Sequence, residues 1–180
     1  GMTEKQVRNE LENFMFANGA DSLAFGSIVA SGPNTANPHA VPSDRVIEKG
    51  DFVLMDYGAG YCDYRSDMTR TVVIGEPTQE QLDLYALVRR THEECVAAIH
   101  PGVEGNDIFK LSKKIIGDAG YGDYYNHSKN TIEIGSVVTM EPGVYLPGVG
   151  GVRLEDYGVV TENGYEPFTK TPHDLHVIDC

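Results

Sequence analysis

Two parts of this sequence follow the same plan, and that internal repeat limits the fold more than any other feature. Residues 102–120 run from Gly-Val-Glu through a helical pattern of apolar residues to Ala-Gly, and residues 1–19 run likewise from Gly-Met-Thr to Asn-Gly. The offset is 101 at both ends (102 − 1 and 120 − 19). Residues 50–56 (GDFVLMD) and 135–141 (GSVVTME) also match, because each leads from a glycine through an apolar strand to an acid. The repeat predicts two related α+β halves.

The offset between the halves changes along the chain. At the acid-bearing strands it is only 85 (135 − 50), so the second half is 16 residues shorter (101 − 85) between its helix and its strand. A segment of the first half therefore has no counterpart in the second. We expect one domain over residues 1–180, with a first half at about 1–75, a linking helix at about 78–100 and a second half at about 102–180.

Local signals predict where the elements of the first half begin. Thr3 with Gln6 and Thr78 with Gln81 have the spacing of a capping box, which favours a helix start at each threonine. Apolar and β-branched runs predict strands between turn residues. These runs lie at residues 24–30, 52–57 and 68–74.

Composition and charge argue against several classes of partner. With 41% hydrophobic and 23% charged residues the chain can bury a core, and no apolar run approaches the length of a membrane span. The net charge of −13 leaves no basic excess to neutralise phosphates, so neither nucleic acid nor a membrane is an expected partner. The cysteines are odd in number and widely spaced, at Cys62, Cys95 and Cys180, which favours unpaired thiols in a reducing cytoplasm.

Four acids stand at equivalent places in the two halves. Asp56 ends an apolar strand, where an ionised carboxylate is costly unless it is paired or bound to a metal. Asp67 follows beside the return strand, so a hairpin would set the two acids side by side, and Glu141 and Glu155 repeat this arrangement. Close carboxylates repel one another unless a cation holds them. Each acid alone would be read as a surface carboxylate, but the four together predict a divalent-metal site.

Several segments together resemble the Xaa-Pro aminopeptidase and prolidase family of metallopeptidases. They are IVASGPN with PH at residues 28–34 and 38–39, MDYGA with YRSDMTRT at residues 55–59 and 64–71, VTMEPGVY at residues 138–145, and GVRLED at residues 151–156. The resemblance covers nearly the whole chain. It implies the pita-bread fold, an α+β fold of two pseudo-symmetric halves, here truncated because the family's N-terminal domain is absent.

The resemblance also implies a role for each acid. Asp56 corresponds to a ligand of one metal, and Asp67 and Glu155 correspond to ligands that bridge two metals. Glu141 corresponds to a ligand that is also the general base. The implied cofactor is a pair of divalent ions, manganese foremost, with cobalt or zinc as alternatives. The two ions would activate a water molecule for attack on the peptide bond.

The resemblance also implies roles for two further residues and a class of substrate. His39 corresponds to a loop histidine near the substrate, and Arg153 to an arginine that orients the acids. The family releases an N-terminal residue that precedes proline, or splits Xaa-Pro dipeptides. The implied partner is therefore a peptide with proline at its second position. The resemblance also leaves room for a homodimer.

The chain departs from the family at one motif, H-S-x-G-H-G-x-G, whose second histidine is a metal ligand. His127-Ser128 matches the start of the motif, but Thr131 stands where the ligand histidine is expected. A block of somewhat under twenty residues is missing there, which is where the repeat independently locates its shortfall. His127 corresponds to a histidine on the substrate side. The remaining histidines, which we interpret as incidental, are His92, His100, His173 and His176.

Three explanations of the missing block remain open. The block is part of the protein but not of this sequence, or it was truly deleted, or it was lost through an error in the gene's predicted coding sequence. We favour the first or third, because a chain freed from catalysis need not keep all four acids. The main hypothesis is a metal-dependent Xaa-Pro peptidase. The alternative is a catalytically impaired pita-bread homologue that binds peptides or proteins, and a creatinase-like C–N hydrolase fits less well.

Overall fold

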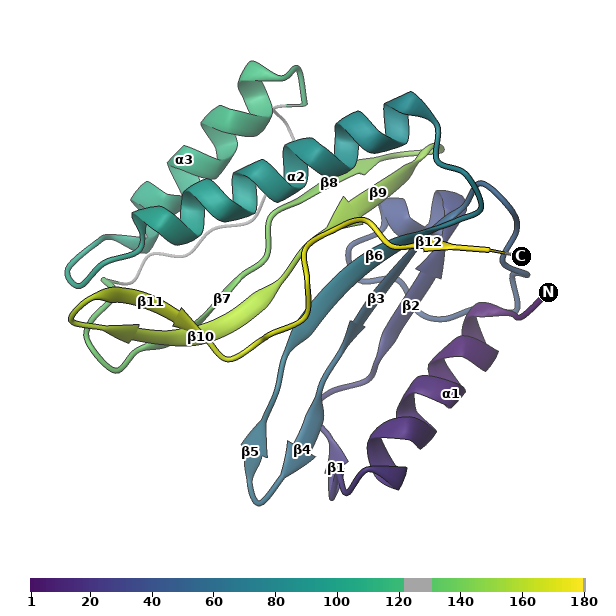
Figure 1. Cartoon of the computed structure of the whole chain (residues 1–180), viewed down its shortest axis with the longest axis horizontal. Coiled ribbons are helices and arrows are strands. Elements are labelled where there is room, and N and C mark those ends of the chain that lie inside the picture. Colours follow the sequence, from purple (N-terminus) through teal and green to yellow (C-terminus); the bar gives the residue numbers. More distant parts are fainter. Residues whose placement is uncertain (122–130, 180) are drawn as a thin grey trace.

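The computed structural model describes residues 1–121 and 131–179. Figure 1 shows α2 (Gln79–Ala98) running above two sets of strands, with α3 (Gly105–Asp118) beside it and α1 (Glu4–Ala17) at the far edge of the larger sheet. In the part of the chain that is described, no helix combines the length and the apolar character that crossing a membrane requires.

The helices confirm the repeat. Both α1 and α3 contain 14 residues, and their first and last residues keep the offset of 101 (105 − 4 and 118 − 17). The predicted capping boxes form at Thr3 and at Thr78. Each threonine hydroxyl accepts a hydrogen bond from the backbone amide of the glutamine at the third position of the helix, and the side chain of that glutamine accepts one from the backbone amide of the threonine. The expected linking helix is α2, which has 20 residues.

The sheet of the first half is built around β3 (Phe52–Tyr57), which matches its predicted range. It pairs antiparallel with β6 (Met68–Ile74) on one edge and with β2 (Ile28–Ser31) on the other. The short β12 (Val177–Ile178) adds a parallel strand beside β6. The sheet order is therefore β12-β6-β3-β2.

The predicted strand at residues 24–30 is wrong at its start. Residues 24–25 bend and residues 26–27 have no regular structure, because the Ala24 amide donates to the carbonyl of Gly58 and the preceding residues 22–23 pair in a different small sheet. That sheet has the order β1-β4-β5. Its strands are Ser22–Leu23, Ala59–Tyr61 and Tyr64–Arg65. This pairing is long-range, so a local sequence pattern could not reveal it.

The second half repeats the strand pair but not its outer neighbour. Its sheet has the order β11-β10-β7, with β7 at Val137–Met140, β10 at Asp156–Thr161 and β11 at Gly164–Pro167. Whereas β3 has partners on both edges, β7 pairs with β10 alone among the described strands. No described strand corresponds to β2 here, which is the structural form of the shortfall. A separate ribbon joins β8 (Gly143–Leu146) to β9 (Gly150–Arg153).

The two halves share one core and touch directly at their strands. The largest buried apolar cluster takes Phe52 and Val73 from the first half, Val88 from α2, and Val152 and Leu154 from the second half. At the boundary, the Glu155 amide donates to the carbonyl of Thr69 at 3.1 Å, which forms an isolated antiparallel bridge. The short 3-10 helix η1 (Gly32–Ala36) packs on β9, where the Gly151 amide donates to Thr35 Oγ1 at 2.6 Å. The predicted acids Asp67 and Glu155 lie on either side of this boundary.

Candidate metal centre

Three of the four predicted acids meet at the boundary between the halves. Asp56 lies near the end of β3, Asp67 lies directly before β6, and Glu155 lies between β9 and β10. The β3–β6 register sets Asp56 opposite Thr69, and the Thr69–Glu155 bridge then brings the second half alongside. One carboxylate oxygen from each acid lies within 4.8 Å of the others. Residues almost 100 positions apart thus form a single group.

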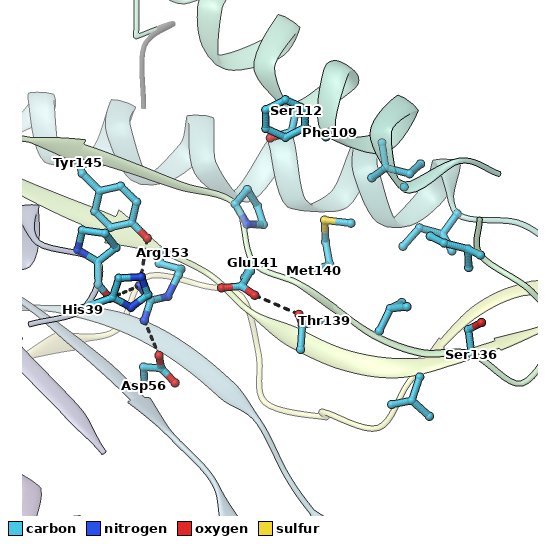
Figure 2. Close-up of a pocket in the computed structure, with 18 of the residues that line it drawn as sticks. His39, Asp56, Phe109, Ser112, Ser136, Thr139, Met140, Glu141, Tyr145 and Arg153 are labelled. Atoms are coloured by element: carbon cyan, nitrogen blue, oxygen red, sulfur yellow. Dashed lines mark hydrogen bonds and ion pairs between the residues drawn. The ribbon is translucent and has the colours of Figure 1, made fainter. Parts of the chain in front are cut away.

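A buried arginine fixes one of these acids. Arg153 is only 3% exposed, and its Nη2 donates to Asp56 Oδ2 at 2.6 Å. Its Nη1 donates to the Tyr145 hydroxyl, as Figure 2 shows, and to the Pro38 carbonyl, each at 3.0 Å. Its Nε donates to Thr69 Oγ1 at 3.0 Å. With all three nitrogens bonded, the guanidinium holds one orientation and so does the carboxylate of Asp56.

Thr69 extends this network to a second acid. Its hydroxyl accepts from Arg153 and donates to Glu155 Oε2 at 2.7 Å, and the side chain is fully buried. From the sequence alone, neither Thr69 nor Tyr145 has a predicted role. A signal for Thr69 existed, because residues two apart on a strand share a face and Asp67 is two positions earlier. For Tyr145 the sequence holds no such signal.

Glu141 lies in the same pocket but outside the group of three. It follows β7, and its Oε1 accepts from the Thr139 hydroxyl at 3.0 Å. Figure 2 shows its carboxylate pointing towards the space beside Arg153 and Asp56. These residues line a cavity of about 980 Å³ together with His39. The charge of Glu141 raises the pKa of Asp56, of Asp67 and of Glu155, so it acts on all three.

The acids are too crowded and too buried to ionise together without a cation. Burial raises the pKa of Glu155 to about 8, and the charge of Glu141 contributes next. Burial also raises the pKa of Asp67 to about 6, assisted by the charges of Asp56 and Glu141. The pKa of Asp56 is raised by burial, although Arg153 opposes the shift. Each proton retained marks a place where a positive charge would stabilise the site.

One unmatched atom supports a metal more directly than the charges do. Asp56 Oδ1 is buried and has no hydrogen-bond partner among the described residues, whereas Oδ2 is bound by Arg153. A buried carboxylate oxygen without a partner is costly, and a divalent cation is a suitable partner for it. The donors therefore fit hard cations held by Asp56, Asp67 and Glu155, with Glu141 facing them.

The histidine predictions have different outcomes. His39 follows η1 and lines the cavity, where its backbone amide donates to Asn37 Oδ1 at 3.0 Å. Thr131 also lines the cavity, but its hydroxyl donates to Glu104 Oε1 at 2.7 Å. His127 lies outside the described residues.

Known proteins resemble this chain in both sequence and structure. The sequence pattern of Metallopeptidase family M24 matches residues 1–162. The Xaa-Pro dipeptidase of Pyrococcus horikoshii is 38% identical over 194 aligned positions, which take in 97% of this chain and 55% of that protein. The solved X-Pro aminopeptidase of Thermotoga maritima is 35% identical with a TM-score of 0.95, over 99% of this chain and 56% of that one. The solved Xaa-Pro dipeptidase of Bacillus anthracis is 41% identical with a TM-score of 0.95, over 99% of this chain and 56% of that one.

These matches cover nearly all of this chain and only about half of each relative. The 194 aligned positions also exceed the 180 residues of this chain, so the Pyrococcus protein has internal residues without a counterpart here. That excess agrees with the shortfall in the second half. The structural matches confirm the predicted pita-bread fold. The family pattern matches most of the sequence, and the relatives are similar to this chain in both sequence and fold. This chain therefore belongs to metallopeptidase family M24.

Proposed function

We propose that this chain hydrolyses the peptide bond that precedes proline, with two divalent metal ions held at the boundary between its halves. The observation that carries the proposal is the cluster of Asp56, Asp67 and Glu155, in which a buried carboxylate oxygen has no hydrogen-bond partner in the part of the chain that the structure describes. The relatives named as Xaa-Pro dipeptidases and X-Pro aminopeptidases supply the substrate class. Since the chain spans about half of their length, the activity itself is a proposal.

Each acid has a distinct task in this proposal. Asp67 and Glu155 come from opposite halves, which suits ligands shared by two ions. Asp56, held by Arg153 through Oδ2, offers its free Oδ1 to one ion. When bound, the two ions lower the pKa of a water molecule, position it and polarise the scissile carbonyl. Glu141 accepts the proton that this water releases, and the Thr139 hydroxyl keeps its carboxylate in place.

The cavity offers a different surface on each side of the acids. His39 and Pro38 lie at the acidic end, beside Arg153. Towards α3 the cavity is lined by apolar residues, among them Phe109 on α3 and Met140 beside Glu141, as Figure 2 shows. An apolar wall suits the proline ring and its neighbour, and polar groups at the other end suit the peptide terminus. We assign His39 to substrate contact.

The proposal also includes the metal, the cellular compartment and the assembly. Manganese is the expected metal, with cobalt or zinc as alternatives, because oxygen donors dominate the site. A reducing cytoplasm suits Cys62 and Cys95, which are both free thiols in the structure, while Cys180 lies outside the described residues. A homodimer is the proposed assembly.

The test measures metal binding first and peptide hydrolysis second. Purified chain is stripped with chelator and dialysed against Mn²⁺, and bound metal is counted. Hydrolysis of Xaa-Pro dipeptides and of longer Xaa-Pro peptides is then followed by release of the first residue. Asp67→Asn and Glu155→Gln should abolish turnover, while Glu166→Gln, at an exposed acid on β11, should not.

Each outcome leads to a different conclusion. A folded chain that takes up no metal overturns the proposal. Metal uptake without cleavage of any Xaa-Pro peptide favours the impaired homologue instead. An intact mass that exceeds 19.7 kDa by about 2 kDa, the mass of somewhat under twenty residues, would show that the protein contains the missing block.

A further inference from the structure

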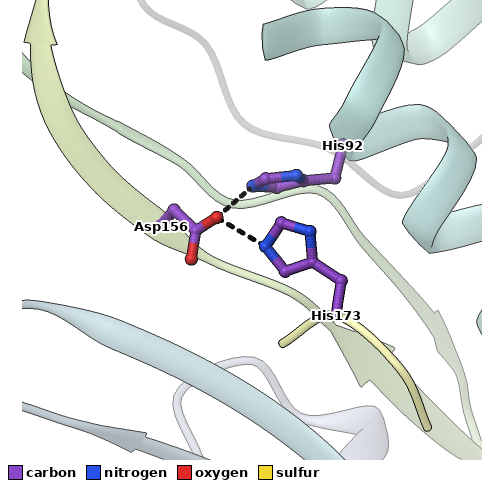
Figure 3. A group of neighbouring side chains, drawn as sticks. All are labelled: His92, Asp156 and His173. Carbon is purple, nitrogen blue, oxygen red and sulfur yellow. Dashed lines mark hydrogen bonds and ion pairs between the residues drawn. The ribbon is translucent and has the colours of Figure 1, made fainter. Parts of the chain in front are cut away.

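A second cluster of metal-ligating side chains lies on the opposite side of β10 from the acids. Successive residues on a strand point to opposite faces, so Asp156 faces away from the site of Glu155. It meets His92 from α2 and His173 from the segment between β11 and β12, as Figure 3 shows. Asp156 Oδ2 lies 2.6 Å from His173 Nε2 and 3.4 Å from His92 Nε2. One donor atom from each residue lies within 4.8 Å of the others.

Within the described residues His92 makes an edge contact with the His173 ring, with 4.8 Å between the ring centroids, and lies beside the Asp156 carboxylate, but it makes no hydrogen bond. It is 2% exposed, and neither of its ring nitrogens has a hydrogen-bond partner there. The 3.4 Å approach to Asp156 brings the two groups close enough for electrostatic attraction, but its geometry is not that of a hydrogen bond. Buried polar groups are nearly always satisfied, so two unmatched nitrogens on one buried ring indicate a partner that the described residues do not supply.

We propose that His92, Asp156 and His173 form a second metal site, selective for a transition-metal ion such as Zn²⁺. The ligand atoms are the two Nε2 atoms and Asp156 Oδ2. Ligands of a tetrahedral zinc ion lie about 3.3 Å apart, given bonds of about 2.0–2.1 Å, which agrees with the 3.4 Å separation at His92. His173 is closer than that at 2.6 Å, but its side chain is 26% exposed and its segment has no regular structure, so it can move outward.

Donor chemistry separates this site from the acidic one. Two imidazoles and one carboxylate suit zinc, copper or nickel, whereas carboxylates alone suit manganese or magnesium. Burial lowers the pKa of His92 to about 4, so its ring is neutral at physiological pH and free to bind a metal.

Arg70 both supports and weakens this site. It donates from Nη2 to Asp156 Oδ1 at 2.7 Å, which fixes the carboxylate and leaves Oδ2 as the ligand atom. It also donates to the carbonyls of Glu155 and Thr171, at 2.7 and 2.8 Å. Its positive charge disfavours a cation nearby, so we expect affinity in the micromolar range rather than the tighter binding typical of structural zinc.

The experiment must first remove the acidic site, because that site also binds divalent ions. In an Asp67→Asn/Glu141→Gln double variant of the full chain, we expect one Zn²⁺ per chain by equilibrium dialysis and elemental analysis. Adding His173→Gln should lower Zn²⁺ affinity at least tenfold. His176→Gln, at an exposed histidine of the same segment, is the matched control and should change nothing. With Co²⁺ in place of Zn²⁺, the visible absorption of a tetrahedral nitrogen-ligated ion should appear and vanish with His173.

The outcomes separate this proposal from the proposed function. No Zn²⁺ in the double variant, or unchanged Zn²⁺ affinity after His173→Gln, overturns the second site and leaves the peptidase proposal untouched. His92→Gln should act like His173→Gln. If that buried substitution prevents folding, the result for His173 decides alone.

Discussion

Replacing Glu155 by glutamine should make the metal-free chain more stable at alkaline pH. Glu155 is 2% exposed and its pKa is raised to about 8, by burial first and then by the charge of Glu141. The unfolded chain loses this proton at about pH 4.5, while the folded chain keeps it until about pH 8. The folded state therefore binds more protons in between, and its stability falls as pH rises through that window. Glutamine has no proton to lose and can still accept from the Thr69 hydroxyl.

The magnitude follows from the width of the shift. One titrating group of this kind changes the free energy of unfolding by about 1.4 kcal/mol for each pH unit inside its window. Between pH 6.5 and 8 we expect a loss of roughly 1.5 kcal/mol, a substantial part of the 5–15 kcal/mol typical of a domain. This interval avoids two other groups, because Asp67, with its pKa raised to about 6, and His92, with its pKa lowered to about 4, act mainly below it.

The assay is urea unfolding at pH 6.5, 7.25 and 8, with chelator present, for the wild-type chain and for Glu155→Gln. The wild type should lose stability across the series, and the variant should lose much less. With saturating Mn²⁺ the wild-type trend should reverse, since a cation then competes with the proton for the same oxygens. A metal-free wild type whose stability stays level or rises over this interval would refute the reasoning. A variant that keeps the full wild-type slope would refute it as well.

Three further predictions concern other residues. Arg153→Lys keeps a positive charge, but a lysine cannot donate to Asp56, Tyr145 and Thr69 together, so Mn²⁺ affinity measured by calorimetry should fall about 10–100-fold. Unchanged affinity would show that the hydrogen bonds of the guanidinium are not needed for metal binding. Leu154→Ala empties a fully buried position in the shared core and should cost about 2–5 kcal/mol in urea unfolding, against less than about 0.5 kcal/mol for Val149→Ala, where the side chain is 72% exposed. Glu4→Gln replaces a fully buried carboxylate that accepts five hydrogen bonds. Burial alone would raise the pKa of Glu4, but the hydrogen bonds from Ser43, Ser31 and Asn34 outweigh it and lower the pKa below its usual 4.5. The wild type should therefore lose stability as pH falls below 4.5, a trend that should be weaker in the variant, and equal acid sensitivity of the two would contradict this account.

The sequence predicted those parts of the fold that depend on local signals. Capping boxes placed the starts of α1 and α2, and apolar and β-branched runs placed β3 and β6. The internal repeat predicted a helix within residues 102–120, where α3 lies, and its change of offset predicted that the second half would lack an element. The irregular backbone at residues 24–27 escaped prediction because it depends on a contact with Gly58, which lies more than 30 positions away.

The candidate site divides in the same way. The four acids were identifiable because a carboxylate at the end of an apolar strand is unusual, and the resemblance added Arg153 and His39. Thr69 and Tyr145 were missed because their roles consist only of hydrogen bonds to Arg153 across the fold. His92 and His173, interpreted as incidental, meet at Asp156 only through the packing of α2 against the end of the chain.

The bridge between Thr69 and Glu155 gives a bound cation a consequence for folding as well as for chemistry. These two residues are 86 positions apart and belong to different halves. An ion shared by Asp67 and Glu155 would close a loop of similar length, much as a disulfide does. Cross-links over loops of that size restrict the unfolded chain by the equivalent of about 4 kcal/mol. The same ions that activate a water molecule would thereby hold the two halves in register, and their removal would loosen the boundary before it disturbed either half.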